Sequence, residues 1–290
     1  MKKLILLLIA FMASIEIIHA GVQGALPGAF SVSATKKVYF SQGNLLYNES
    51  TKIWLFAAHQ YSTSDFERFG WGTGNNPTQT TGSYYLYSTF TDWGVNKISN
   101  GQNTANLWRT LSKEEWQYLL QTRNKANILY GQGKVNDVQG LIILPDNWST
   151  PSGMSFTAAP NNYTTNVYTI SQWSTMEAAG AVFLPARGRR NVGVYSVGTS
   201  GYYWTTTKYN SQFCYCFEFS QTFVGFDDWD NYYGMSVRLV LDANKNTYTI
   251  KFANYNGSLL QTLEVPSGAT PTYTGSTPTR PSTAEYAYTF

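Results

Sequence analysis

One stretch of this chain carries a full set of helix signals, and their scarcity elsewhere limits the folds open to it. Ser112 and Glu115 have the spacing of a capping box, and Leu111 with Trp116 has that of a hydrophobic staple. The apolar residues Trp116, Leu119 and Leu120 then lie on one side. The pattern predicts a core-facing helix from Ser112 to about Arg123.

A second, shorter helix is predicted around Ser174 to Ala179. Ser174 and Glu177 repeat the Ser-x-x-Glu spacing, and Gly180 can end the helix. The other periodic segments are short and bounded by turn residues, which is typical of strands. They include residues 30–60, the apolar runs Leu141–Pro145 and Ala181–Pro185, and the segments Tyr202–Thr207, Phe213–Phe219 and Ser236–Leu241.

Two longer stretches have no clear period. Residues 62–106 are rich in Gly, Asn and Thr, with aromatic residues scattered through them. We expect irregular structure there, pinned by buried rings. The connection from Ser220 to Gly234 is predicted to be an irregular loop. Few helices, many short strands and long loops together indicate an α+β fold.

The N-terminus has the pattern of a secretory signal peptide, assigned to residues 1–20. Lys2 and Lys3 precede an apolar run from Leu4 to Ile15, which is short for a membrane span, and cleavage is expected before Gly21. We expect a mature protein without a transmembrane segment that is secreted, extracellular or attached to a bacterial cell surface.

The composition excludes several classes of protein. Charged residues make up 13% of the chain, against about 25% in an average protein, while aromatic residues reach 16%. Such a chain is neither a coiled coil nor a charge-driven disordered segment. Two cysteines cannot form a disulfide-dense scaffold. After removal of the leader only His59 remains, which argues against a His-based triad or a multi-His metal site. The short basic run Arg187–Arg190 is too small for a nucleic-acid footprint and is interpreted as a solvated turn.

Four ordered blocks carry a family resemblance. They are Trp108–Trp116, Ala179–Pro185, Gly201–Thr207 and Tyr233–Val240. They resemble the Fibrobacter-type major paralogous domain, a variant of the C-type-lectin-like, sulfatase-modifying-factor-type fold. The resemblance implies one such domain over residues 21–245, with two short helices around irregular antiparallel sheets. Because this fold hosts both enzymes and binding modules, the resemblance alone does not assign an activity.

The C-terminal segment, residues 246–290, differs in texture and resembles the Listeria–Bacteroides (internalin B-type) repeat, a small β-grasp-like surface module. Members of that family continue to a Gly-Trp pair, whereas this sequence stops at Phe290, so a partial repeat is expected. Asn256-Gly257 is a strong hairpin signal. It predicts two paired strands, Tyr248–Ala253 and Leu259–Val265.

Cys214 and Cys216 are the residues that an enzyme hypothesis would use. Formylglycine-generating relatives oxidise their substrates with a copper-binding cysteine pair, but they space the two cysteines more widely. Residues two apart in a strand point to the same side, and a disulfide between them would be strongly distorted, so we expect free thiols. Small side chains within a strand are the simpler interpretation, and a copper-dependent oxidase remains the alternative.

Acidic residues suggest two further kinds of site. Asp227, Asp228 and Asp230 could help to bind Ca²⁺, although their spacing does not match an EF-hand and a solvated loop is the simpler explanation. Paired carboxylates for glycoside hydrolysis could include Glu218. No metal or cofactor is expected otherwise.

The clearest functional signal is a concentration of aromatic and amide side chains between residues 201 and 235. Tyr and Trp offer rigid contact area with a polar tip, and Asn, Asp and Ser add adaptable polar contacts. Tyr215, Phe217 and Phe219 alternate and are assigned to the core. The predicted ligand-binding residues, expected to converge on one exposed face, are Tyr202, Tyr203, Trp204, Phe226, Asp227, Asp228, Trp229, Asp230, Tyr232 and Tyr233.

The sequence thus predicts a secreted, non-enzymatic binding module that recognises an extracellular glycan or protein. The alternatives are a formylglycine-generating-type oxidase using Cys214 and Cys216, and a structural surface protein without a ligand.

Overall fold

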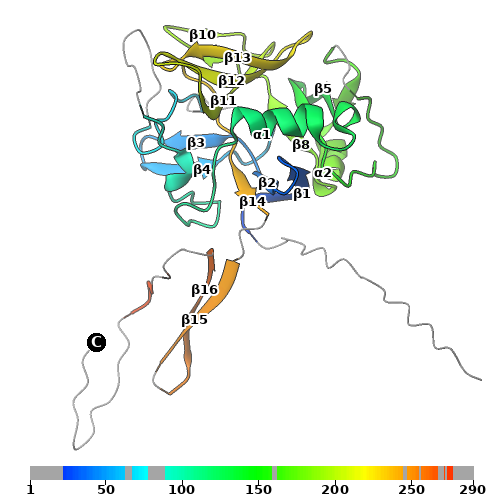
Figure 1. Ribbon diagram of the computed structural model, residues 1–290. Coiled ribbons are helices and arrows are strands. Elements are labelled where there is room, and N and C mark those ends of the chain that lie inside the picture. Colours follow the sequence, from blue (N-terminus) through cyan, green and yellow to red (C-terminus); the bar gives the residue numbers. More distant parts are fainter. Residues whose placement is uncertain are drawn as a thin grey trace, which may run out of the picture.

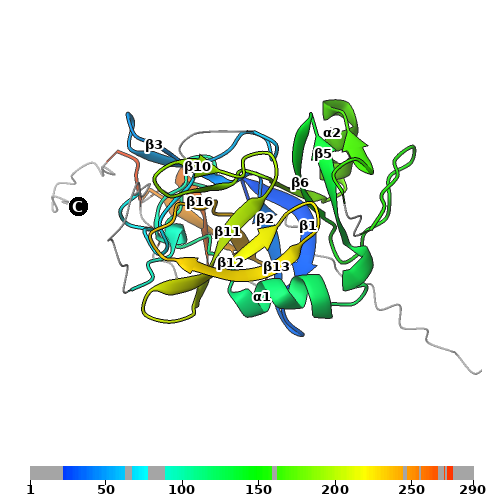
Figure 2. The same cartoon turned by 90° about the horizontal axis from the view of Figure 1, so that it is seen from above.

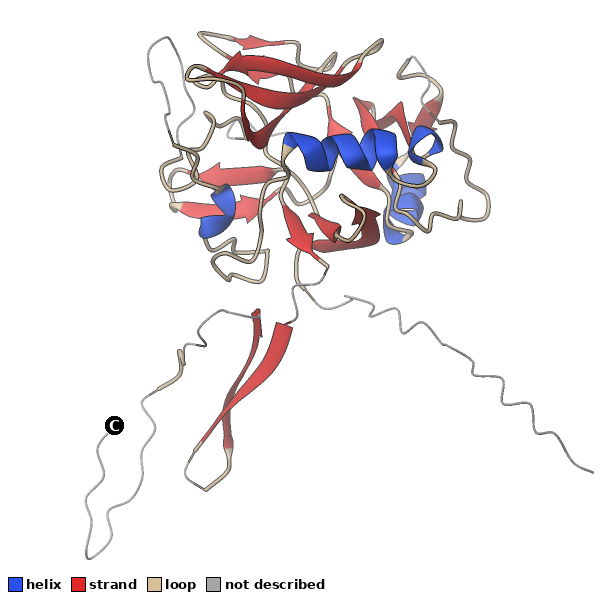
Figure 3. Ribbon diagram, in the orientation of Figure 1, coloured by secondary structure: helices blue, strands red, loops and turns tan. Residues whose placement is uncertain are grey.

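The computed structural model describes residues 22–62, 67–77, 89–158, 162–243, 247–254, 256–266, 271 and 273–276 (Figure 1). Within these residues the helices are short, and strands and loops form most of the molecule (Figure 3). The helices are α1 (Lys113–Gln117), α2 (Ile170–Ala178) and the single turns η1 (Trp93–Val95), η2 (Tyr118–Thr122) and η3 (Ala126–Ile128). This mixture agrees with the predicted α+β class. The predicted signal peptide lies outside the described residues.

The strands form several small sheets rather than one large one. Strands β1 (Ala25–Ser31), β2 (Lys37–Ser41) and β14 (Val240–Asp242) pair in the order β1-β2-β14, so the first and the last strand of the main domain flank β2 in one sheet. A mostly antiparallel sheet has the order β7-β5-β6-β8 and consists of β7 (Asn166–Tyr168), β5 (Tyr130–Val135), β6 (Val138–Ile143) and β8 (Val182–Pro185). The two apolar runs that end in Pro are therefore buried strands, as predicted, and the structure adds that they pair with each other.

The third larger sheet carries the candidate site. It contains β11 (Gly201–Lys208), β12 (Phe213–Phe219) and β13 (Val224–Asp230), with β12 in the centre (Figure 2). Three hairpins complete the described strands: β3 (Leu45–Asn48) with β4 (Ile53–Phe56), β9 (Arg189–Arg190) with β10 (Val194–Tyr195), and β15 (Thr247–Ala253) with β16 (Leu259–Pro266).

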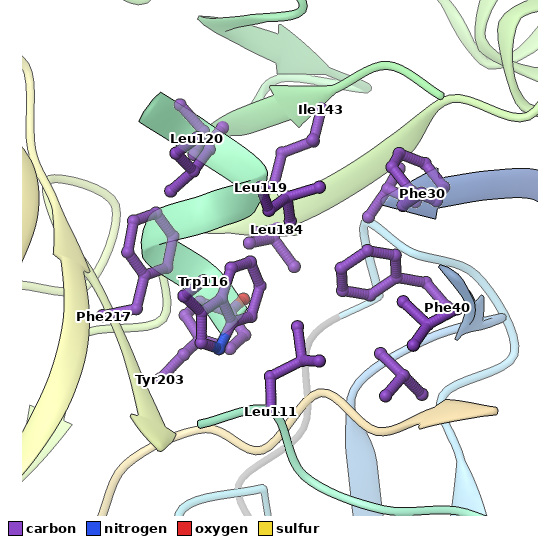
Figure 4. Close-up of a cluster of buried hydrophobic side chains, with 14 of the residues drawn as sticks. Phe30, Phe40, Leu111, Trp116, Leu119, Leu120, Ile143, Leu184, Tyr203 and Phe217 are labelled. Carbon is purple, nitrogen blue, oxygen red and sulfur yellow. The ribbon is translucent and has the colours of Figure 1, made fainter. Parts of the chain in front are cut away.

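The helix at Ser112 forms as its local signals predict. The Ser112 hydroxyl accepts a hydrogen bond from the Glu115 N–H, and the Glu115 carboxylate accepts one from the Ser112 N–H. Trp116 is buried and stacks on Phe217 of β12, with ring centroids 4.8 Å apart (Figure 4). The chain continues past α1 as the wider turn η2, which keeps Leu119 and Leu120 in the same core.

The predicted start of the second helix is wrong. Helix α2 begins four residues earlier, because Thr169 and Gln172 form its capping box. Ser174 lies inside the helix, and its hydroxyl donates a hydrogen bond to the carbonyl of Ile170. Gly180, with a φ of +98°, follows the helix and closes it, as predicted.

Two strand predictions also need correction. Residues 224–230, expected to be irregular, form β13 and pair with the whole of β12. The segment 236–241 forms a strand only from Val240, although Ser236 makes an isolated bridge to Tyr203. By contrast, Phe69, Trp71 and Trp93 are buried within the irregular 62–106 stretch, as expected for the part of it that is described.

The C-terminal segment contains the predicted hairpin, β15 and β16, with Gly257 at a φ of +82° in its turn. Tyr273 packs against Phe252, and Thr274 exchanges two hydrogen bonds with Gln261. Among the described residues, none of the helices has both the length and the apolar character that a membrane crossing requires.

Candidate binding site

Strand alternation divides the predicted site between the two sides of the β11–β12–β13 sheet. We call the side of Cys214, Cys216 and Glu218 the Cys face, and the side of Phe217 and Phe219 the Phe face. The register places Asp227 opposite Cys216 and Trp229 opposite Cys214, on the Cys face. Phe226, Asp228 and Asp230 therefore belong to the Phe face, where Phe226 packs on Phe217 with ring centroids 5.9 Å apart.

The three aspartates consequently do not all lie on one face of the sheet. No cluster of three or more His, Cys, Asp or Glu side chains suited to a metal ion occurs within the described part of the chain. On the Phe face, Asp230 accepts a hydrogen bond from Gln212 at 2.6 Å. The exposed Asp227 instead accepts one from the backbone N–H of Asp228.

Tyr202, Tyr203 and Trp204 are buried, so the prediction that they lie on an exposed face is wrong. The Tyr203 hydroxyl donates to the carbonyl of Pro185 at 2.9 Å, and the Trp204 indole N–H donates to that of Phe69 at 2.7 Å. Both faces of β11 are covered by core side chains, and its outer edge bridges to Gly188 and Ser236. Tyr203 and Trp204 therefore belong to the core, and Tyr202 reaches a ligand only through its rim neighbours.

A central residue of the site is Arg189, which sequence reasoning missed. Its guanidinium carbon lies 4.1 Å from the ring centroid of Trp229. It also lies 5.4 Å from the centroid of Tyr202, 5.5 Å from that of Tyr233 and 5.8 Å from that of Tyr195. Four aromatic rings from three separate segments of the chain thus surround one cation, an arrangement that cation–π attraction stabilises.

The basic run Arg187–Arg190 is accordingly not a solvated turn. Arg187 is buried and forms an ion pair with the buried carboxylate of Glu67. Backbone hydrogen bonds hold the strand on both sides of Arg189, from Gly188 N–H to Ser200 and between Arg190 and Gly234, each at 2.8 Å. Gly188 has a φ of +64°, and a Cβ there would lie 2.0 Å from the Tyr195 carbonyl oxygen, so glycine is required.

The guanidinium of Arg189 has unused hydrogen-bonding capacity. The side chain of Arg189 forms no hydrogen bond and no ion pair with any part of the chain that the structure describes, and its Nε is buried. The N–H groups of the two terminal nitrogens, four of the five donors of a guanidinium, are therefore available to a ligand or to water. This is unusual for a half-buried cation, because charged groups away from water are normally paired.

Two carboxylates share the Cys face with the rings that surround Arg189. Glu218 is opposite Tyr202 in the register, and Asp227 is its diagonal neighbour on β13. Burial is the largest influence on Glu218 and raises the pKa of its carboxyl, and the charge of Asp227 acts in the same direction. The polar atoms of Trp229 and Tyr202, together with Arg189, lower this pKa and offset part of the effect.

Cys216 lies between Tyr202 and Trp229 on the central strand. The small thiol side chain leaves room for the two rings to meet edge to face over β12, with centroids 5.8 Å apart. Both cysteines are buried free thiols, as predicted. Burial raises the pKa of Cys214 to about 12 and that of Cys216 well above its ordinary value, so both remain protonated at neutral pH.

Arg189, the four rings around it and the two carboxylates of the Cys face are together called the rim cluster. Its members are Arg189, Tyr195, Tyr202, Glu218, Asp227, Trp229 and Tyr233. Tyr195 is half-exposed, Asp227 is exposed, and the ring of Tyr232 lies tilted against that of Tyr233 with ring centroids 5.2 Å apart. Asn191 donates a hydrogen bond to the Tyr233 hydroxyl at 3.1 Å, which ties the β9–β10 turn to the cluster.

The opposite side of the sheet has its own exposed aromatic contact. Phe217 and Phe219 are core residues, as predicted, but Tyr215 is only half-buried. The ammonium group of Lys113 lies 3.5 Å from the centroid of the Tyr215 ring, which also contacts the exposed Tyr209. This contact ties α1 to β12 and provides a matched control surface for tests of the rim cluster.

Comparison with known proteins adds one match. Residues 157–240 match the model of a domain of unknown function, DUF8237. The matched segment runs from before α2 to the first residue of β14, so it contains every residue of the rim cluster. No curated protein and no solved structure matches the chain.

Proposed function

We propose that this protein is an extracellular binding module that recognises a glycan or protein ligand through the rim cluster. The observation that carries the proposal is the state of Arg189, a half-buried cation ringed by aromatic side chains whose N–H groups have no partner within the described residues. A core arginine is normally paired, as Arg187 is with Glu67. Unused donors beside half-exposed Tyr rings and two carboxylates suit a surface that meets a ligand.

The proposal also covers the fold of the domain and the location of the protein outside the cell. The resemblance of the four sequence blocks supports a C-type-lectin-like, sulfatase-modifying-factor-type domain, and that of residues 246–290 supports a β-grasp-like repeat behind it. The leader pattern of residues 1–20 supports export, with secretion or attachment to a bacterial cell surface. The composition fits this location, because polar uncharged side chains and aromatic rings make up much of the chain.

The copper-dependent oxidase is less well supported. Such chemistry uses thiolates, and burial keeps the thiols of Cys214 and Cys216 protonated. Their place beneath the Tyr202–Trp229 contact gives them a packing role instead. A structural surface protein without a ligand is the remaining alternative, and it leaves the unpaired donors of Arg189 without a use.

The test is an array of glycans and extracellular proteins probed with residues 21–290, followed by substitutions in the rim cluster. Asp227→Asn keeps the hydrogen bond to Asp228 and the shape of the side chain, so it changes the charge at an exposed position. Tyr232→Ala removes a neighbouring ring, and Tyr209→Ala on the Phe face is the matched control. Saturable binding that falls in the first two variants, with an unchanged melting temperature, supports the proposal. Binding that all three variants retain, or no binding at all, contradicts it.

A further inference from the structure

The rim cluster presents hydrogen-bond donors and acceptors side by side, and this restricts the chemistry of its ligand. Arg189 supplies donors only, since a guanidinium has no acceptor. Glu218 and Asp227 supply acceptors when ionised, and neither forms an ion pair with Arg189. Diagonal neighbours on adjacent strands lie about 7–8 Å apart, which leaves room for a small polar group between the two carboxylates.

The local charge does not favour an anionic ligand. Arg189, together with Lys208 opposite Cys214, faces two carboxylates on the Cys face, so the charges balance, and burial already disfavours the charged form of Glu218. A carboxylate or sulfate brought to Arg189 would meet both of these acids. Arg189 could pair with it, but at the cost of like-charge repulsion at short range.

A cationic ligand is disfavoured for a different reason. The ring faces that would attract a cation are already in contact with the Arg189 guanidinium, which lies only 4.1 Å from the Trp229 centroid. A second cation would have to displace Arg189 or lie against it. The attraction of Glu218 and Asp227 would then be offset by repulsion from the arginine.

We propose that the rim cluster binds a neutral sugar whose hydroxyl groups bridge Arg189 and the carboxylates of Glu218 and Asp227. A hydroxyl group both donates and accepts, so adjacent hydroxyls use the two kinds of group at once. The half-exposed rings of Tyr195 and Tyr233 offer apolar surface for the C–H side of the sugar. This inference rests on the proposed function and names the ligand class of the same site.

The experiment uses residues 21–290 on a glycan array sorted by charge, followed by calorimetry with matched monosaccharides. Each neutral methyl hexoside is compared with its uronic acid and its 2-amino sugar, so that the ring is kept while the charge changes. We expect hits among neutral glycans and weaker binding of both charged analogues. Stronger binding of the uronic acid or of the amino sugar overturns the inference.

Three substitutions assign the roles of the residues. Arg189→Lys keeps the charge but loses the planar fork of donors, and Glu218→Gln and Asp227→Asn replace an acceptor oxygen by an amide N–H. Loss of one hydrogen bond to a charged group corresponds to about tenfold or more in affinity, so each variant should bind at least about tenfold more weakly. Lys36→Ala changes an exposed residue that is not part of the rim cluster, so it serves as the control and should leave the affinity unchanged. Affinities within twofold of the wild type in all three rim variants, at unchanged melting temperature, also overturn the inference.

The outcome separates this inference from the proposed function. A protein ligand whose binding depends on Tyr232 and Asp227, with no glycan bound, refutes the sugar while leaving the binding module intact. No ligand on either array refutes both.

Discussion

Replacing Trp116 by Ala tests the packing of the main core. Trp116 is buried, stacks on Phe217 at 4.8 Å and contacts Phe40 at 5.6 Å, so it joins α1 to β12 and β2. Truncation of a core Trp or Phe to Ala costs about 3–5 kcal/mol. Two aromatic contacts are lost, each worth about 0.5–1.5 kcal/mol beyond burial, which places this site in the upper part of that range at about 4–5 kcal/mol.

The assay is equilibrium unfolding in urea, read by far-UV circular dichroism, with a parallel thermal scan. For a domain of this size, 1 kcal/mol corresponds to about 2–4 °C, so the expected decrease in melting temperature is about 8–20 °C. Val167→Ala is the control, because Val167 is 52% exposed and its truncation should change the free energy of unfolding by less than about 0.5 kcal/mol. A loss below about 2 kcal/mol for Trp116→Ala, with an unchanged urea dependence, would refute the packing argument.

Three further predictions follow from the structure. Limited proteolysis should cut first at residues 244–246 or within residues 270–283, because the β15–β16 hairpin pairs with no other described strand. Equal resistance to cleavage along the whole chain would contradict a C-terminal segment that is separate from the main domain. Cys214 and Cys216 should react with a disulfide reagent at pH 8 only after unfolding, because burial keeps both thiols protonated. Rapid labelling of the native protein would contradict this prediction, since it would show that the thiols are accessible. Glu218→Gln should raise the melting temperature at pH 7, because the raised pKa of Glu218 means that its ionised form destabilises the folded state. This gain in melting temperature should vanish as the pH falls below about 4.5, where Glu218 is protonated in both the folded and the unfolded state. A gain that does not depend on pH would point to another cause.

Local signals predicted the local structure where one signal stood alone, and they failed where two signals competed or where a strand lacked alternation. The capping box at Ser112 forms because its two hydrogen bonds join residues three apart. The same pattern at Ser174 failed because Thr169 and Gln172 form a capping box five residues earlier. Strand β13 was missed because its two faces are both half-buried, so Val-Gly-Phe-Asp-Asp-Trp-Asp shows no alternation of polar and apolar residues.

The candidate site was predictable in its location but not in its centre. Trp229 and Tyr233 lie in the rim cluster, as expected from the aromatic content of the segment, whereas Asp228 and Asp230 fall on the other face of the sheet. Arg189 meets rings that lie between 6 and 44 residues away in the sequence. The Asn191-Val-Gly-Val turn after the basic run could have indicated a hairpin there. No local pattern indicates which rings that hairpin meets.

The pairing order β1-β2-β14 has a mechanical consequence. The chain enters and leaves the main domain through the two outer strands of this sheet, and in Figure 1 the sheet lies at the end of the molecule away from β10 and β13. A pulling force between a ligand bound at the rim cluster and the C-terminal segment would therefore act across the whole domain, with β14 as the last element of the domain before that segment. That strand is held at both edges, by β2 on one side and by the backbone of Arg109 on the other, and the Arg109 guanidinium also pairs with Asp242 at 2.7 Å. Detachment of β14 would therefore require breaking its contacts on both edges. A force on the C-terminal segment is resisted jointly by β14, by β2 and by the segment around Arg109 that leads into α1.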